Sequence, residues 1–271
     1  YDTGLHRHFV DPTKPFAERV LDASHGALIT SATLRDEENW DAATARTGLD
    51  YMAAPPSQAA VPSPFDYAEQ TRVYVISDID KNNPDQLATA YRELMKASGG
   101  GALGLFTSIA RLRQVHQRLA NTPEMEKLML LAQHVDPLDT GTLVDIFRAE
   151  ENACLLGTDA VRDGIDVPGR ALRLVVYDRV PWPRPTILHK TRKADFEERH
   201  FGAKYDDMLT RLRLKQAYGR LVRRADDHGV FVMLDRAMPS RLTGAFPEGV
   251  DVHRIGLADV IREAKEFLNQ R

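Results

Sequence analysis

The strongest constraint on the fold is a regular alternation of short apolar runs with longer segments of helical character. Runs of this kind are typical of strands that are buried on both faces of a parallel sheet. They cover Val73–Ile76, Ala102–Thr107, Leu128–His134, Asn152–Thr158, Leu172–Tyr177, Val230–Leu234 and Val252–Ile255. The alternation predicts an α/β sandwich with a mostly parallel central sheet.

The intervening segments predict helices, and the N-terminal part of the chain has a different texture. The helices are expected over 85–97, 109–119, 142–149 and 205–224, and from Leu257 onward. Before them, the sequence predicts a helix up to His25 and a short buried strand over 26–30. The Ala-, Pro- and Ser-rich stretch 53–64 is expected to be an irregular loop.

Composition sets broad limits on size, partners and location. With 271 residues, 43% of them hydrophobic, the chain can form one large domain. The net charge of −3 gives no information on a nucleic-acid partner, because a local basic groove can exist in a mildly acidic protein. The single cysteine, Cys154, excludes a disulfide or an all-cysteine iron–sulfur cluster within this chain, and its apolar neighbours predict burial. No metal site is predicted. No signal peptide or membrane span is apparent, so we expect a cytoplasmic fragment without a membrane partner.

The glycine-rich run 99–104 has the spacing of a dinucleotide-binding fingerprint. That fingerprint requires the glycines to follow a strand and to open a helix, so that the pyrophosphate lies on the helix N-terminus. Here they follow a predicted helix and lead into a predicted strand. We therefore expect a helix C-cap and a turn, and no dinucleotide site.

The segment 215–224 carries the most chemical information. On one continuous helix, Gln216, Arg220 and Arg223 share a face, and Gly219 beside them lets a ligand or another lobe approach closely. Arginine presents a planar fork of donors that suits phosphate oxygens. The pattern is therefore consistent with polyphosphate recognition, and a solvated basic helix face is the alternative.

These residues and four further sequence segments resemble the motifs of a known family. The pattern Gln216-x-x-Gly219-Arg220-x-x-Arg223 is similar to motif VI of superfamily 2 helicases, in the form found in the DinG and XPD relatives. The four further segments occur in the family's order. They are Thr30–Leu34 (motif III), Ser63–Asp66 (entry to the second lobe), Leu105–Ser108 (motif IV), and Gly157–Asp159 with Gly164–Gly169 (motif V). The resemblance covers nearly the whole chain and implies a RecA-like three-layer sandwich. It also implies a remnant of the lobe linker over 1–34 and the second helicase lobe over 35–271.

The resemblance implies roles in ATP hydrolysis. Arg220 and Arg223 are expected to be arginine fingers that reach the γ-phosphate, and Gln216 is expected to position the attacking water or the phosphate. Gly164 and Asp166 are expected at the nucleotide cleft, together with Gly219. Asp166 has an alternative role as a loop residue that bonds its own backbone.

Three hydroxyl side chains are candidates for contact with single-stranded DNA. Thr107, Ser108 and Thr158 follow predicted strands, at the position where open α/β sheets place ligands. Their hydroxyls can bond backbone phosphates. Ordinary helix capping is the alternative, above all for Ser108.

The chain also departs from the family pattern. It has no Gly-x-x-x-x-Gly-Lys-Ser/Thr loop and no Asp-Glu-Ala-His box. Within motif V, residues 160–163 stand where many relatives carry a bulky aromatic–acidic pair. We therefore expect the second lobe without the first, and a strand over 27–30 that has lost its native sheet. ATP and Mg²⁺ are expected to bind mainly to the first lobe, so that this chain alone is inactive. The expected partners are single-stranded DNA, ATP and the protein's own N-terminal lobe. The alternatives are an RNA or hybrid helicase, a helicase-nuclease, and a non-catalytic nucleic-acid-binding module.

Overall fold

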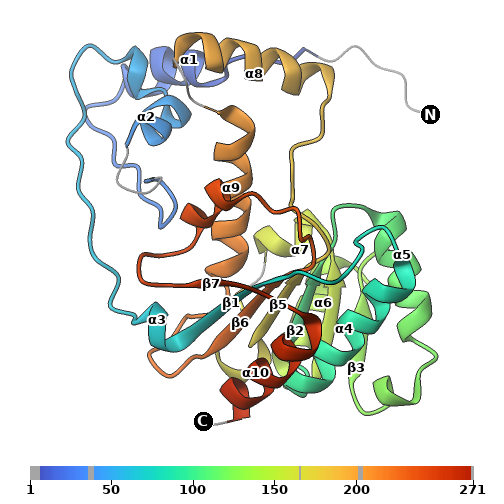
Figure 1. Ribbon diagram of the computed structural model, residues 1–271. Coiled ribbons are helices and arrows are strands. Elements are labelled where there is room, and N and C mark those ends of the chain that lie inside the picture. The colour runs from blue at the N-terminus through green and yellow to red at the C-terminus, as the bar shows by residue number, and fades with distance from the viewer. Residues whose placement is uncertain (1–6, 36–39, 165, 201–203, 270–271) are drawn as a thin grey trace. The chain divides into compact units, whose positions relative to one another are not determined.

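The computed structural model describes residues 7–35, 40–164, 166–200 and 204–269. The chain forms two compact units, which are described separately (Figure 1). The smaller unit comprises residues 1–62 and 182–212, and the larger comprises 63–181 and 213–271. The predicted division into a linker remnant over 1–34 and a lobe over 35–271 stays a prediction.

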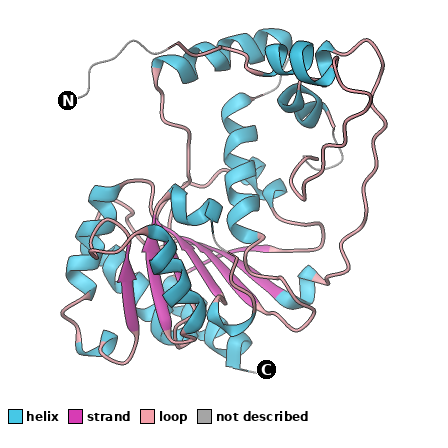
Figure 2. Ribbon diagram, turned by 180° about the vertical axis from the view of Figure 1, so that it is seen from behind, coloured by secondary structure: helices cyan, strands magenta, loops and turns pink. Residues whose placement is uncertain are grey.

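The larger unit is built on a seven-stranded sheet in which every neighbouring pair of strands is parallel. The strands are β1 (Thr71–Ile76), β2 (Ala102–Leu105), β3 (Met129–Ala132), β4 (Ala153–Gly157), β5 (Leu174–Tyr177), β6 (Gly229–Met233) and β7 (Val252–Ile255), in the order β3-β4-β2-β5-β6-β1-β7. Figure 2 shows them in magenta, running in one direction. Each predicted apolar run of this unit contains or overlaps one strand. All side chains of β2, β4, β5 and β6 are buried, as expected for strands covered on both faces.

Helices cover both faces of this sheet (Figures 1 and 2). One face packs against α4 (Pro84–Ser98), α5 (Ile109–Leu119) and α10 (Leu257–Asn269). The other packs against α6 (Thr140–Ala149), α7 (Asp159–Gly164), the end of α9 (Tyr205–Tyr218) and the 3₁₀ turn Ser240–Ala245. This arrangement confirms the predicted three-layer α/β sandwich.

Local sequence signals explain where the helices begin. Asn83 accepts hydrogen bonds from the backbone N–H groups of Asp85 (3.0 Å) and Gln86 (3.2 Å), and Pro84 occupies the first turn of α4. Asp139 caps α6 in the same way, through the N–H of Thr142 at 3.1 Å. Short helical turns α3 (Tyr67–Gln70), Pro123–Met125 and Gly169–Ala171 complete this unit.

The glycine-rich run forms a turn, as predicted. Gly99 has a φ of +67° and terminates α4, and Gly100 and Gly101 also have positive φ. The buried guanidinium of Arg173 holds this turn, because it donates to the carbonyl oxygens of Ser98 and Gly99, each at 2.8 Å. It also donates to Glu151 O at 3.0 Å and to Arg170 O. The run therefore connects a helix to a strand and opens no helix.

The smaller unit consists of short helical segments. It contains α1 (Thr13–Phe16), the π-helical turn Ala17–Leu21, α2 (Asp41–Thr47), the 3₁₀ turn Leu49–Tyr51, α8 (Ile187–Arg199) and the beginning of α9. Ala45, Phe196 and Met208 form its small core. Asp206 lies 2.6 Å from the ammonium group of Lys193.

The strand predicted over 26–30 is wrong. These residues belong to no strand, and the side chain of Leu28 is 89% exposed. An isolated strand leaves its backbone groups unpaired, so the segment needs a neighbouring strand to form one. No such neighbour exists for it in the described part of the chain. Among the described residues, no helix is both long and apolar enough to cross a membrane.

Candidate functional site

The end of α9 presents the predicted arginine motif away from the core. Leu214, Ala217 and Tyr218 are at most 3% exposed and fix the helix to the sheet. The Tyr218 hydroxyl lies 2.7 Å from that of Thr71, the first residue of β1. The motif therefore lies at the amino edge of the sheet, where the strands begin. Its polar members keep contact with solvent, since Gln216 and Arg220 are half-buried and Arg223 is exposed.

The expectation of one helix over 205–224 is wrong, because α9 ends at Tyr218. The N–H of Arg220 bonds to Ala217 O at 3.2 Å and that of Leu221 to Tyr218 O at 3.0 Å, so the last turn tightens to i→i−3 bonds. Gly219 is exposed directly after the helix, and a Cβ there would lie 3.1 Å from Lys215 O. Arg220 therefore follows Gln216 by one turn, whereas a separate loop carries Arg223.

Asp227 braces that loop. Its Oδ2 accepts hydrogen bonds from the backbone N–H groups of Arg223 and Arg224, both at 2.8 Å. Its Oδ1 accepts a bond from the N–H of Gly169 at 3.1 Å. Asp227 is only 5% exposed. The amide nitrogen of Gln70 donates to the carbonyl oxygen of Asp227 at 3.0 Å. Charge-assisted bonds of this kind are about twice as strong as neutral ones, so this loop is firmly held.

The structure brings Arg223 and Asp166 together. Arg223 Nε lies 3.6 Å from Asp166 Oδ1, and the Asp166 side chain is 77% exposed. The backbone of Asp166 is held separately, by a bond of 3.0 Å from Arg148 Nε to its carbonyl oxygen. An exposed ion pair of this length contributes ~0–1 kcal/mol, so Arg223 can exchange partners readily. Gly164 is the last residue of α7, and Ile165 of motif V lies outside the described residues.

Thr107, Ser108 and Thr158 lie at the opposite, carboxyl edge of the sheet. Ser108 Oγ accepts a bond from Arg111 N at 3.4 Å and caps α5. The alternative prediction of helix capping is therefore correct for Ser108. Thr158 Oγ1 donates to Gln133 Oε1 at 3.0 Å. A strand of five residues is about 17 Å long. The arginine motif and the three hydroxyls therefore form two sites at the two ends of the strands.

Two buried aspartates at the carboxyl edge were missed from the sequence. Asp178 follows β5 with 0% exposure, and it accepts bonds from Thr107 N at 3.1 Å and from Arg111 Nε. Burial raises the pKa of the Asp178 carboxyl, and Arg111 opposes this effect. Asp235 follows β6 with 3% exposure, and each of its oxygens accepts a bond of 2.7 Å from Lys81 Nζ. The available signal was an aspartate placed directly after an apolar run.

Within the described residues, no group of three or more His, Cys, Asp or Glu side chains is arranged to hold a metal ion. Chemically, the amino edge offers guanidinium groups and an amide that suit a polyphosphate, and the carboxyl edge offers hydroxyls and cations that suit single phosphates.

Sequence comparison identifies a matching family and several relatives. Residues 91–253 match the model of the helicase C-terminal domain. The chain is 30% identical over 253 residues to the ATP-dependent DNA helicase YoaA of Escherichia coli K12, which covers 88% of this chain and 38% of YoaA. It is 34% identical over 231 residues to the ATP-dependent helicase DinG of Mycobacterium tuberculosis H37Rv, which covers 81% of this chain and 33% of DinG. It is 30% identical over 238 residues to the 3'-5' exonuclease DinG of Bacillus subtilis 168, which covers 84% of this chain and 25% of that relative.

Two solved structures share the fold. The Xpd4 protein of S. tokodaii gives a TM-score of 0.50 at 12% identity, covering 68% of this chain and 38% of that chain. S. cerevisiae Dbp5, bound to RNA and ADP BeF3, gives 0.51 at 15% identity, covering 74% of this chain and 46% of that chain. The chain thus spans 25–38% of the length of the three relatives.

Proposed function

This chain belongs to the family of helicase C-terminal domains of the DinG/XPD type, and from that premise we propose that it is the second ATPase lobe of an ATP-dependent DNA helicase. In this proposal the lobe supplies arginine fingers to ATP bound mainly by an N-terminal lobe. It also supplies part of a groove for single-stranded DNA. The N-terminal lobe would hold the phosphates and Mg²⁺.

One observation carries the proposal: two arginines and a glutamine stand at a solvent-accessible position beside a rigid brace. Gln216 and Arg220 are half-buried, Arg223 is exposed, and Asp227 fixes the backbone that leads to Arg223. A finger must be pre-positioned to be effective, because a donor that has to be ordered during the reaction contributes less.

The chemistry follows from the charge of phosphoryl transfer. As the γ-phosphoryl group leaves, negative charge spreads over its oxygens, and a guanidinium stabilises that charge. Arg220 and Arg223 would donate to these oxygens, while the amide of Gln216 would orient the attacking water. Gly219 offers no side chain that could keep the nucleotide away.

The pair of Arg223 and Asp166 supports a link between ATP binding and lobe closure. Arg223 Nε lies 3.6 Å from Asp166 Oδ1. A γ-phosphate carries more charge than one carboxylate and would replace Asp166 as the partner of Arg223. Asp166 and Gly164 would then border the nucleotide.

At the other edge, Thr107, Ser108 and Thr158 would contact the phosphates of the DNA strand. The hydroxyls of Ser108 and Thr158 make hydrogen bonds within the fold, and each hydroxyl oxygen has two lone pairs and one proton. Backbone contacts of this kind fix the register of a strand and are independent of its sequence.

Substitution of the two arginines in the full-length protein tests the proposal. Arg220→Ala and Arg223→Ala should each lower the kcat of DNA-stimulated ATP hydrolysis by roughly 10³-fold or more, because fingers act in the transition state. ATP affinity, measured by titration with a fluorescent nucleotide, should change by less than about tenfold. Arg224→Ala is the matched control, since Arg224 is an exposed neighbour outside the motif.

Wild-type turnover of both finger variants would refute the assignment. Unwinding assays on DNA, RNA and hybrid duplexes separate the proposed DNA helicase from an RNA or hybrid helicase. Nuclease assays on the same substrates test the third alternative. The 271-residue chain alone should show no sustained Mg²⁺-dependent hydrolysis. The cytoplasmic location expected from the sequence stays a prediction.

A further inference from the structure

Residues 219–223 carry both proposed arginine fingers, and we call them the finger segment. The two apolar residues of this segment, Leu221 and Val222, are 1% and 5% exposed. Leu221 packs so closely on Gly229, the first residue of β6, that a Cβ on that glycine would lie 2.7 Å from Leu221 Cδ2. The middle of the finger segment is therefore anchored in the core. The direction of each arginine then depends on how the two ends of the segment are held.

The short helix α3 adjoins both ends of the finger segment. The pairing of β1 with β6 places Thr71 opposite Gly229, so α3, which leads into β1, lies beside the loop that leads into β6. Thr71 contacts the residue before the finger segment, and Gln70 contacts residues after it. These contacts join parts of the larger unit that are 147 to 157 residues apart in the chain.

Tyr218 holds the first end of the finger segment. Its hydroxyl lies 2.7 Å from Thr71 Oγ1, and Thr71 donates its single proton to the carbonyl oxygen of Tyr67 at 2.6 Å. The Tyr218 hydroxyl is therefore the donor in its bond with Thr71. Burial raises the pKa of the Tyr218 phenol, so the hydroxyl retains the proton that this bond needs. The rings of Tyr218 and Tyr67 also pack together, with centroids 6.0 Å apart.

Gln70 holds the second end of the finger segment. It is 6% exposed, and its amide nitrogen donates to the carbonyl oxygens of Arg224 (3.3 Å), Ala225 (3.0 Å) and Asp227 (3.0 Å). Three acceptors require that the nitrogen of the amide faces this loop. The Asp227 carboxylate binds N–H groups of the same loop. The two side chains therefore hold the loop in complementary ways, one through its carbonyl oxygens and the other through its N–H groups.

The helix α3 is itself fixed at both ends. Asp66 caps its beginning by accepting a bond from Glu69 N at 3.2 Å. Just beyond its end, Arg72 Nη1 donates to Ala68 O at 2.6 Å, and the Arg72 guanidinium lies over the ring of Phe267 in α10, 4.4 Å from its centroid. A helix held in this way can support the finger segment.

We propose that α3 positions the two fingers of the ATPase, with Gln70 and Tyr218 as the positioning residues. Gln70 acts on Arg223 through the loop that follows this arginine, and Tyr218 acts on Arg220, which lies two residues further along the chain. Donors that are held before the reaction need no reordering in the transition state. This inference rests on the proposed function and adds residues that act only through the fingers.

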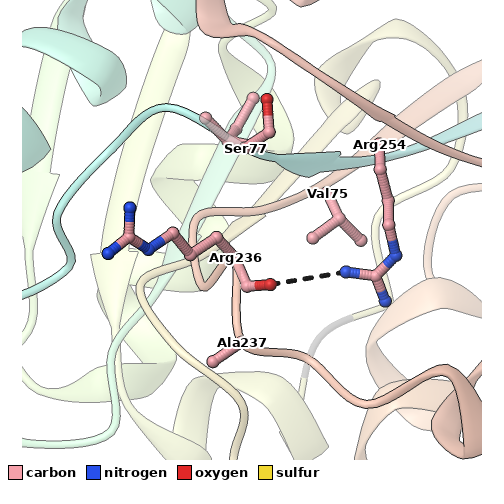
Figure 3. Close-up of a pocket in the computed structure, with 6 residues that line it drawn as sticks. Val75, Ser77, Arg236, Ala237 and Arg254 are labelled. Carbon is pink, nitrogen blue, oxygen red and sulfur yellow. Dashed lines mark hydrogen bonds between the residues drawn. The ribbon is translucent and has the colours of Figure 1, made fainter.

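The other end of β6 provides an internal comparison. There, Arg254 of β7 donates to the carbonyl oxygens of Met238 (2.6 Å) and Arg236 (3.4 Å), in the loop after β6. Figure 3 shows the bond to Arg236 beside a hollow of about 440 Å³, which is lined by Val75, Ile76, Ser77, Arg236, Ala237 and Arg254. Arg254 thus holds carbonyl oxygens as Gln70 does, but at the carboxyl edge. A variant at Arg254 therefore loosens a loop of the same strand without affecting the fingers.

The test uses the full-length protein and the variant Gln70→Met, which keeps the length of the side chain and removes the amide. At saturating single-stranded DNA, kcat for ATP hydrolysis should fall by about tenfold or more, while ADP affinity should change by less than about twofold. Affinity for ADP with tetrafluoroaluminate, a mimic of the transferring phosphoryl group, should fall by the same factor as kcat, because the fingers act in the transition state. Simple loss of folded protein lowers the number of nucleotides bound per chain and leaves the ratio of the two affinities unchanged.

Double variants show whether each positioning residue acts through its finger. In the Arg223→Ala background, Gln70→Met should lower kcat further by less than about twofold, because the finger that Gln70 positions is already absent. Tyr218→Phe removes a single hydroxyl and is the milder variant. It should lower kcat several-fold in the wild-type background and hardly at all in the Arg220→Ala background. If Gln70→Met does not fold, Tyr218→Phe decides the test by the same criteria.

Arg254→Met is the matched control. It should lower the melting temperature but leave kcat and the ratio of the two affinities unchanged. Wild-type kcat in folded Gln70→Met, or an equal loss of kcat in the Arg223→Ala background, would overturn the inference. An equal shift of the affinity ratio in Arg254→Met would also overturn it, because any loosened loop would then have the same effect. Wild-type turnover of Arg220→Ala and Arg223→Ala would instead refute the proposed fingers, so the single variants separate the two failures.

Discussion

The carboxylate of Asp227 accepts the backbone N–H of Arg223 at 2.8 Å, and its other oxygen holds Gly169 at 3.1 Å. One buried side chain therefore joins the last residue of motif V to the loop that carries an arginine of motif VI. The contact lies wholly within the larger unit.

Asp227→Asn should lower both stability and turnover. The amide keeps the size of the side chain but can offer only one oxygen, so at least one buried N–H loses its partner, at about 1–3 kcal/mol. In the full-length protein, kcat for ATP should fall by more than about tenfold, while KM changes little, because the proposed finger Arg223 would be displaced from the position needed in the transition state.

Asp226→Asn is the control for this prediction, since Asp226 is the exposed neighbour. Thermal melting and steady-state kinetics give the two readouts. A variant at Asp227 that melts earlier but turns over normally would show that the brace serves only the fold.

Arg173→Met should destabilise the larger unit by about 3 kcal/mol. The guanidinium serves four carbonyl oxygens around the glycine turn, and its loss leaves several of them buried without a donor. Arg170→Met, the same change at a side chain that is 57% exposed, should shift stability by less than about 0.5 kcal/mol. Urea denaturation followed by circular dichroism measures the free energy of unfolding of both variants. Equal losses of stability in the two variants would contradict the bracing role of Arg173.

Gly104→Ala should also be destabilising, by about 1–3 kcal/mol. An added Cβ would lie 2.6 Å from Leu156 Cδ2 and 2.9 Å from Tyr91 Cε1, and both of those side chains are buried in the core. Gly26→Ala has nothing within 4 Å of the added atom and should be neutral. A difference of several degrees in melting temperature between the two variants checks the prediction.

Cys154 should resist thiol reagents while the protein is folded. Burial raises the pKa of the Cys154 thiol to about 12, so at pH 8 only about one molecule in 10⁴ carries the reactive thiolate. Lowering the pH reduces this fraction further, and raising it toward the pKa increases it. Labelling with a chromogenic disulfide should be slow in buffer and rapid in denaturant. Rapid labelling in buffer would show that β4 opens.

The sequence predicted the sheet because its strands are buried on both faces. Runs such as 153–157 contain no polar residues that would interrupt the apolar pattern. The strand Val252–Ile255 was predicted with its exact bounds. Gly99 was recognised as a cap because the order of helix, glycine and strand determines which conformation it needs. The strand over 26–30 failed because pairing depends on a neighbour that a local pattern does not encode.

The candidate sites were predictable only in part. Gln216, Arg220 and Arg223 were found through their motif, but continuous helical periodicity gave no warning that the helix stops at Tyr218. Beyond that point the loop is held by Asp227, whose carboxylate accepts the backbone N–H groups of Arg223 and Arg224. Asp178 and Asp235 were missed for a similar reason. Their importance arises from Arg111 in α5 and Lys81 in the loop after β1. The strand order that assembles these groups cannot be deduced from spacing along the chain.

The parallel strands have a mechanical consequence. The loop that carries Arg223 lies where the strands begin, and Thr107, Ser108 and Thr158 lie where the strands end. Central strands such as β6 form a stiff, fully hydrogen-bonded connection between them. A force on the loop that carries Arg223 would therefore move the whole sheet as a rigid body rather than deform it. In the proposed helicase, the DNA contacts would therefore move together with the lobe during each nucleotide-driven step, without a relay of side chains through the interior.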